Sequence, residues 1–147
     1  MNIETQEALY LQLLNRFEYN GNKQAVASTH VALGVFYLEH EDFEESYTAF
    51  ETGISIFEEL KLDFLVSKAI YQMLPLLQIK KEYPNIVERG YRALTHFHET
   101  KQTLHIRMMV SRLKVILANS GNTDFYDLHP IQTSRHLDKL ISDIGDS

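Results

Sequence analysis

The apolar residues of this chain recur at intervals of three and four, and this spacing constrains its fold more than any other feature. In one segment, Phe43, Tyr47, Phe50, Ile54 and Phe57 alternate between the two intervals. Such spacing places all five on one face of an α-helix and predicts that the face is buried. Glycine and proline are scarce and β-branched runs are absent, so we expect an all-α fold.

The same pattern predicts about seven helices joined by short turns. Pro84 and Pro130 suit first turns, where a missing N–H costs nothing. Gly121 and Asn122 mark a stop after the sixth helix. Short connections require sequential neighbours to pack antiparallel, so we expect helix pairs. The predicted helices span residues 3–19, 24–39, 42–60, 63–81, 84–99, 103–120 and 130–144.

Length and composition bound the class of protein. A chain of 147 residues with 44% hydrophobic and 23% charged side chains can bury a core and is not of a disordered type. There is no cysteine, which excludes disulfides, thiolate chemistry and cysteine-based zinc sites. No basic run precedes an apolar core at the start, and no apolar stretch reaches the roughly 20 residues of a membrane span. A soluble cytoplasmic protein without membrane contact is therefore expected.

Small residues lie among large ones in the segment from Ala32 to Ile54. Gly34, Ser46 and Gly53 fall where two antiparallel helices should cross closely. Large neighbours would fill the space between the crossings; these are Leu33, Tyr37, Phe43 and Phe50. The segment therefore predicts a tightly packed helix pair.

This pattern resembles the tetratricopeptide repeat (TPR) family. Its elements are the Leu33-Gly34 pair, Tyr37 three residues on, an aromatic opening of the second helix, and the small, aromatic and small positions that follow. Ser46 and Gly53 stand where the family usually has alanine, and His30 stands where it has a large aromatic residue. The resemblance implies antiparallel helix pairs stacked as a short right-handed solenoid.

A frame shift of forty residues gives a degenerate second copy, in which Leu74 and Gly90 fall under Gly34 and Phe50. This period exceeds the roughly 34 residues usual for the family. In spacing, though not in motif, it is similar to the repeats of bacterial peptide-sensing regulators and their phosphatase relatives. We therefore expect one domain over residues 1–147, with an irregular helical bundle as the alternative. Its parts are a half repeat at 3–19, repeats at 24–60 and 63–99, and a degenerate repeat or cap at 103–144.

In the TPR family the first helix of each pair lines a concave groove that binds peptides or helices. Spacing carries this role onto a mixed wall of apolar, cationic and amide side chains, which suits an extended peptide or a partner helix. The predicted wall is Val31, Val35, Glu39, Lys68, Tyr71, Gln78, Met108, Ser111, Arg112, Val115 and Asn119. Val31 and Val35 stand where members that clamp a terminal carboxylate have Lys and Asn, so that mode is not expected. The alternatives are a groove filled by the chain's own last helix, or plain surface.

The first helix lacks the partner that would complete its repeat. Tyr10, Leu14 and Phe17 could then expose an apolar face that pairs with a second copy, giving a homodimer. The same observation is expected if the chain is a piece of a larger protein. The sequence leaves both explanations open.

Charge is distributed unevenly along the chain. Residues 1–60 hold 11 acidic and 2 basic side chains, whereas residues 61–147 hold 9 acidic and 12 basic ones. The net charge of −6 argues against general nucleic-acid binding, because phosphate contacts supply that affinity. A basic strip from Lys80 to Lys114, which includes Arg89, Arg92, Arg107 and Arg112, keeps a nucleic-acid-contacting regulator as an alternative.

No motif for chemistry is visible. His96 and His98 point about 200° apart on a helix, and His129 and His136 are seven residues apart, so neither pair is expected to share a metal ion. There is no phosphate loop, nucleophile elbow or catalytic dyad, and no cofactor is expected. The sequence thus predicts a non-catalytic binding module with a regulatory or scaffolding role. The further alternative is an accessory part of a peptide-sensing phosphatase or transcription regulator.

One acidic cluster lies at a predicted turn. Carboxylates at the start of a helix are stabilised by its dipole, so we interpret the cluster as solvated helix-start charge. It could also serve as an electrostatic docking patch for a basic partner. Its members are Glu39, Glu41, Asp42, Glu44 and Glu45.

Overall fold

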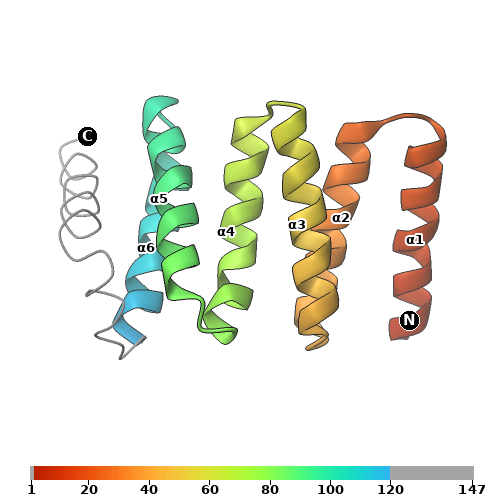
Figure 1. Ribbon diagram of the computed structural model, residues 1–147, viewed down its shortest axis with the longest axis horizontal. Coiled ribbons are helices and arrows are strands. Elements are labelled where there is room, and N and C mark those ends of the chain that lie inside the picture. The colour runs from red at the N-terminus through yellow and green to blue at the C-terminus, as the bar shows by residue number, and fades with distance from the viewer. Residues whose placement is uncertain (1, 120–147) are drawn as a thin grey trace. The chain divides into compact units, whose positions relative to one another are not determined.

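The computed structural model describes residues 2–119, which form six α-helices and no strand (Figure 1). The all-α class predicted from the sequence is confirmed, and each predicted helix end in this part of the chain lies within two residues of the observed one. The predicted helix at 130–144 and the stop at Gly121-Asn122 lie outside the described residues. The helices are α1 (Ile3–Tyr19), α2 (Lys23–Glu39), α3 (Phe43–Glu59), α4 (Asp63–Ile79), α5 (Tyr83–Glu99) and α6 (Thr103–Asn119).

Every helix has 17 residues, and each starts 20 residues after the one before it. The predicted period of forty residues for a helix pair agrees with this spacing. Pro84 lies in the first turn of α5, as predicted. Helix length is therefore uniform even though the sequences of the helices differ.

One turn geometry recurs at all five connections. Its middle residue adopts a left-handed backbone, with φ of 71° at Gly21 and 57° to 62° at Glu41, Lys61, Lys81 and Lys101. The residue after it donates its N–H to the carbonyl five residues back, as in Asp42 to Tyr37 at 2.8 Å. This is the Schellman arrangement, which satisfies carbonyls at a helix end. A repeated turn of this kind fixes the uniform spacing of the helices.

Contacts divide the chain into two units, residues 1–76 and 77–147. The division falls inside α4, directly after Leu76 and one residue past Pro75, which lies within the helix. A proline in a helix interior has no N–H to donate to the carbonyl four residues earlier, and it commonly bends the helix. The two units are described separately below.

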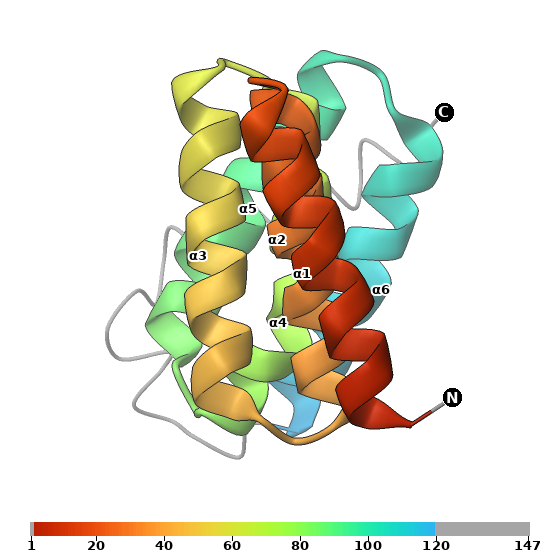
Figure 2. The ribbon, with the colours of Figure 1, turned by 90° about the vertical axis from the view of Figure 1, so that its right-hand side faces the viewer.

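The first unit is built around the close crossing of α2 and α3, which run side by side (Figure 2). A Cβ atom added at Gly34 would lie 2.8 Å from the ring of Phe50, and one added at Gly53 would lie 2.8 Å from the carbonyl oxygen of Ala27. The hydroxyl of the fully buried Ser46 donates to the carbonyl of Gly34 at 2.7 Å. The prediction that these three small residues mark close crossings is confirmed.

Helix α1 packs against α2, and none of its residues is fully buried. The half-buried side of α1 carries Tyr10, Leu14 and Phe17, and the ring of Tyr10 lies 5.6 Å from that of Phe36 in α2. Tyr10, Leu14 and Phe17 are thus partly covered within the chain, and their role as a dimer face stays a prediction.

The side of α1 turned away from α2 is exposed and mainly polar. Its residues, placed there by the 3.6-residue turn of the helix, are Thr5, Ala8, Gln12, Asn15 and Arg16. Polar side chains of this kind are suited to contact with water.

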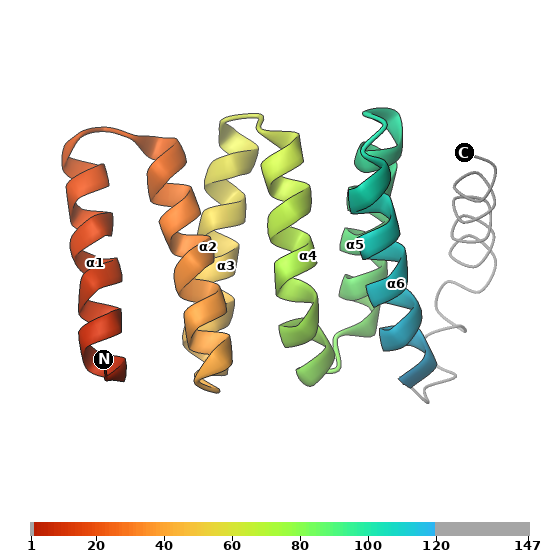
Figure 3. The ribbon, with the colours of Figure 1, turned by 180° about the vertical axis from the view of Figure 1, so that it is seen from behind.

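In the second unit α5 packs against α6 (Figure 3). A Cβ atom added at Gly90 would lie 2.8 Å from Cδ2 of Leu113, so the side chain beside Gly90 is that of Leu113 in α6. Phe97 of α5 and Met109 of α6 are fully buried in this unit's core.

Candidate functional site

A groove lies between α1 and α2 on the surface of the first unit. It consists of two depressions of about 600 and 350 Å³, which share Tyr10, Leu13 and Ala32 and so form one continuous groove. We call it the α1–α2 groove. Its α1 side carries Gln6, Leu9, Tyr10, Leu13 and Phe17, and its α2 side carries Ala25, Ser28, Thr29, Ala32, Val35, Phe36 and Glu39, with Asn22 and Gln24 at one end.

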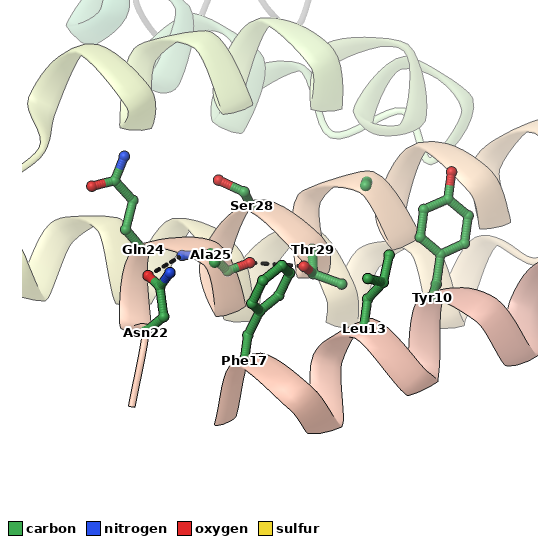
Figure 4. Close-up of a pocket in the computed structure, with 9 residues that line it drawn as sticks. Tyr10, Leu13, Phe17, Asn22, Gln24, Ala25, Ser28 and Thr29 are labelled. Atoms are coloured by element: carbon green, nitrogen blue, oxygen red, sulfur yellow. Dashed lines mark hydrogen bonds between the residues drawn. The ribbon is translucent and has the colours of Figure 1, made fainter. Parts of the chain in front are cut away.

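Helix geometry explains why the groove is open on the α2 side. The groove-facing residues of the first half of α2 are small, and they leave space beside the larger side chains that rise from α1 (Figure 4). Tyr10, Leu13 and Phe17 form the α1 wall in this view. An apolar wall next to a floor of small residues is a shape into which another helix or chain can pack.

Hydrogen bonds occupy two of the polar side chains around the groove (Figure 4). Asn22 Oδ1 caps α2 by accepting the N–H of Ala25 at 3.1 Å. The hydroxyl of Thr29 donates to the carbonyl of Ala25 at 2.7 Å, which leaves its methyl group to the surroundings. Ser28 and Gln24 are exposed and can offer polar groups to a bound partner. The groove is therefore mainly apolar, with a few polar groups for orientation.

Two leucines of the groove remain exposed to solvent. Leu9 is 45% exposed and Leu13 is 43% exposed, although both lie on the flank of α1 next to α2. Contiguous exposed apolar surface with a polar rim is typical of a site that binds a partner. Four-residue spacing alone does not tell which apolar side of a helix is covered, so the sequence did not single out these two leucines.

The predicted wall residues of α2 lie in two different environments. Val35 and Glu39 line the α1–α2 groove, as a binding role requires. Val31 is only 7% exposed, and its Cγ2 atom lies 2.7 Å from the position that a Cβ atom on Gly53 would take. Val31 is thus a core residue of the α2–α3 crossing, since only a glycine opposite it leaves room for its side chain.

The predicted α4 residues do not line the α1–α2 groove. Lys68 is exposed, and its Nζ lies 5.6 Å from the centre of the Phe64 ring one turn earlier. Tyr71 is half-buried in the same unit. Gln78 is half-exposed and belongs to the second unit.

The predicted residues of α6 lie on an exposed side of that helix. Met108 is 38% and Val115 is 59% exposed, and Leu104, which the sequence analysis did not nominate, is 66% exposed. Ser111 is exposed and Arg112 is half-exposed. Asn119 ends α6, and its side chain is outside the described residues.

The described parts of the two units carry net charges of opposite sign. Residues 1–76 carry 12 acidic and 4 basic side chains, whereas residues 77–119 carry 3 acidic and 8 basic ones. All five members of the predicted acidic cluster are exposed at the end of α2, in the turn after it and in the first turn of α3. In the basic strip, Arg92, Arg107 and Lys114 are exposed, while Arg89 is half-exposed.

A hydrogen bond joins α1 and α2 on the flank of α1 that lies away from the groove. The hydroxyl of Tyr37 in α2 donates to the side chain of Glu7 in α1. Burial and then this hydrogen bond raise the pKa of Tyr37 to about 12, from an ordinary 10.0. The neutral phenol is therefore favoured by the folded chain.

We expect this tie to weaken in alkaline solution. Because the folded pKa of Tyr37 lies above the unfolded one, its stabilisation is complete below pH 10 and is lost as pH rises towards about 12. At neutral pH the urea midpoint of wild type should be higher than that of Tyr37→Phe. This difference should shrink as pH rises past about 10. The comparison removes the contribution of the other tyrosines. A difference between the two midpoints that stays constant with pH would contradict this assignment.

The histidines of the described chain take part in packing and local hydrogen bonds. Burial lowers the pKa of His30, and the nearby Glu18 carboxylate partly opposes this effect. The Nδ1 atom of His40 lies 2.8 Å from the carbonyl oxygen of Phe36. Among residues 2–119, no group of three or more histidine or carboxylate side chains is placed to hold a metal ion. No helix in this part of the chain is long and apolar enough to span a membrane.

Comparison of the chain with family models, with curated proteins and with solved structures gives no match.

Proposed function

We propose that this chain is a non-catalytic, TPR-like module that binds a protein or peptide and acts in regulation or scaffolding. The observation that carries the proposal is the α1–α2 groove, in which Leu9 and Leu13 stay exposed beside a floor of small residues. The resemblance of the α2–α3 pair to a tetratricopeptide repeat supports it. In this proposal the helix pairs continue as a short right-handed solenoid, with partner contacts on the first helix of each pair.

The groove has the features that favour a polypeptide over a small metabolite. It is open to solvent and lined by two helices, and its polar lining residues include Gln6, Gln24, Ser28 and Glu39. Spaced apolar contacts flanked by polar groups are typical of helix and peptide recognition. A polypeptide could cover the two exposed leucines, and this burial would drive binding.

A selection from a random peptide library on the immobilised chain tests this proposal. We expect peptides with spaced apolar residues to be enriched and to bind wild type at least about tenfold more tightly than the double variant Leu9→Ser, Leu13→Ser. Leu11 is 41% exposed on the other flank of α1, so Leu11→Ser is the matched control and should bind as wild type does. Failure to enrich any peptide, or equal binding by all three proteins, would contradict the proposal.

The positive charge of residues 77–119 supports a second candidate, a regulator that contacts nucleic acid through exposed Arg92, Arg107 and Lys114. Binding of this kind depends steeply on salt, because phosphate contacts release counterions. A measured affinity for duplex DNA or RNA that falls steeply between about 50 and 200 mM salt would favour this candidate. Binding of peptides in the α1–α2 groove is expected to change much less with salt.

A further inference from the structure

Helix α6 carries two apolar faces, and the described residues 2–119 cover one of them. Ile106, Met109 and Leu113 are buried in the second unit. On the opposite side Leu104, Met108 and Val115 stand exposed at spacings of four and seven. We call these three residues the α6 stripe. Exposed apolar residues at helical spacing are the anchors by which a helix docks into a groove.

Basic side chains border the α6 stripe. Arg107 and Lys114 are exposed and lie along one edge of it, by the geometry of the helix. The described part of the second unit has a surplus of five basic side chains, whereas the first unit has a surplus of eight acidic ones. The α1–α2 groove has Glu39 at one end and no basic residue among its lining residues. The basic edge of the stripe is therefore opposite in charge to the first unit as a whole, and Glu39 is the charged side chain among the groove's lining residues.

The two surfaces also match in length and shape. From Leu104 to Val115 the stripe extends about 16 Å, at a rise of 1.5 Å per residue. The α1 wall from Gln6 to Phe17 has the same length of about 16 Å. Along the groove, Ala25, Ser28 and Ala32 leave room for protruding side chains, and Leu9 and Leu13 offer apolar partners. A stripe of protruding apolar side chains is the shape that such a groove accepts.

We propose that the α6 stripe of one copy of this chain docks into the α1–α2 groove of a second copy. This inference rests on the proposed function, because it names the protein partner that the groove binds. Burial of the leucines and of Val115 drives the contact, and the opposite charges of the two units steer it. The two surfaces differ, so the contact is heterologous. A pair of copies still has one free groove and one free stripe for further copies, which gives rings or open chains.

Sedimentation velocity of the purified chain tests the proposal directly. We expect the average mass to rise with concentration between about 1 and 500 µM, as for a contact of micromolar affinity. The groove variant Leu9→Ser, Leu13→Ser and the stripe variant Leu104→Ser, Val115→Ser should each be monomeric, with at least a tenfold weaker association constant. Leu11→Ser is the matched control and should associate as wild type does. Circular dichroism of each variant should show unchanged helix content.

A mixture of the two monomeric variants provides the sharpest test. The groove variant keeps its stripe and the stripe variant keeps its groove, so the mixture should form one-to-one dimers and nothing larger. A wild type that stays monomeric over the whole range would overturn the inference. Coverage of the groove by residues 120–147 or by another part of the same chain would give this result and would overturn the inference equally. A mixture that forms no dimer would overturn it as well.

The outcomes separate this inference from the proposed function. If the wild type is monomeric but selected peptides bind the α1–α2 groove, the partner is a foreign polypeptide and only the present inference fails. If neither peptides nor second copies bind, both fail.

Discussion

Replacing Phe50 by alanine should lower the free energy of unfolding by about 4 kcal/mol. Phe50 is fully buried in α3, and its ring lies against Gly34 of α2 at the distance at which a Cβ atom would clash. The ring fills the gap that the glycine leaves, so its removal opens a cavity at the centre of the α2–α3 crossing. Loss of buried surface and the cavity together set the cost.

Urea unfolding monitored by circular dichroism measures this loss. Helical repeat chains can unfold in parts, so hydrogen exchange of peptides from α2 and α3 should show the loss locally as well. Phe43→Ala is the matched control, because Phe43 lies in the same helix and is half-exposed. Its cost should be less than half as large. Equal losses for the two variants would mean that the crossing does not depend on the ring of Phe50.

The sequence was sufficient to place the helices and the α2–α3 crossing, because both follow from local rules. Apolar residues at intervals of three and four define a helix wherever most of them are buried, as Phe50, Ile54 and Phe57 are. Small residues such as Gly34 and Gly53 are unusual inside helices, where glycine costs about 1 kcal/mol relative to alanine. Close packing between helices is the common reason why a protein tolerates that cost, and both glycines lie at such a close contact.

The uniform turns were not predictable from the sequence in the same way. A left-handed backbone at a helix end usually signals itself by glycine. Here only Gly21 does so, and Glu41, Lys61, Lys81 and Lys101 adopt the same backbone without that signal. The predicted ends of several helices were therefore one or two residues away from the observed ones.

The candidate site was predicted only in part, because family spacing and exposure are different kinds of information. Spacing placed Val31 in the groove wall, yet Gly53 opposite it draws its side chain into the core. The same spacing correctly placed Val35 and Glu39 beside open surface. Leu9 and Leu13 were missed because α1 has apolar residues on more than one side. Which side is covered depends on the neighbouring helix, and no pattern within α1 carries that information.

Replacing Gly53 by alanine should lower the free energy of unfolding by about 2 kcal/mol, although alanine is the better helix former. The added Cβ atom would lie 2.7 Å from Val31 Cγ2, 2.8 Å from the carbonyl oxygen of Ala27 and 3.2 Å from the backbone nitrogen of Val31. Backbone atoms of α2 cannot move aside by a rotamer change, so the two helices must separate. That separation weakens the packing around Phe50 and the 2.7 Å hydrogen bond from Ser46 to Gly34.

Gly90→Ala is the control that distinguishes backbone crowding from crowding by a side chain. The atoms nearest to its added Cβ would be the end of the Leu113 side chain, at 2.8 and 3.1 Å. A leucine end can rotate away, and the gain in helix propensity of about 1 kcal/mol offsets most of the remaining cost. The urea midpoint of Gly53→Ala should therefore be well below that of Gly90→Ala. The reverse order would show that the α2–α3 crossing yields more easily than the contact of α5 with α6, and that the small residues of the repeat are not what holds α2 and α3 together.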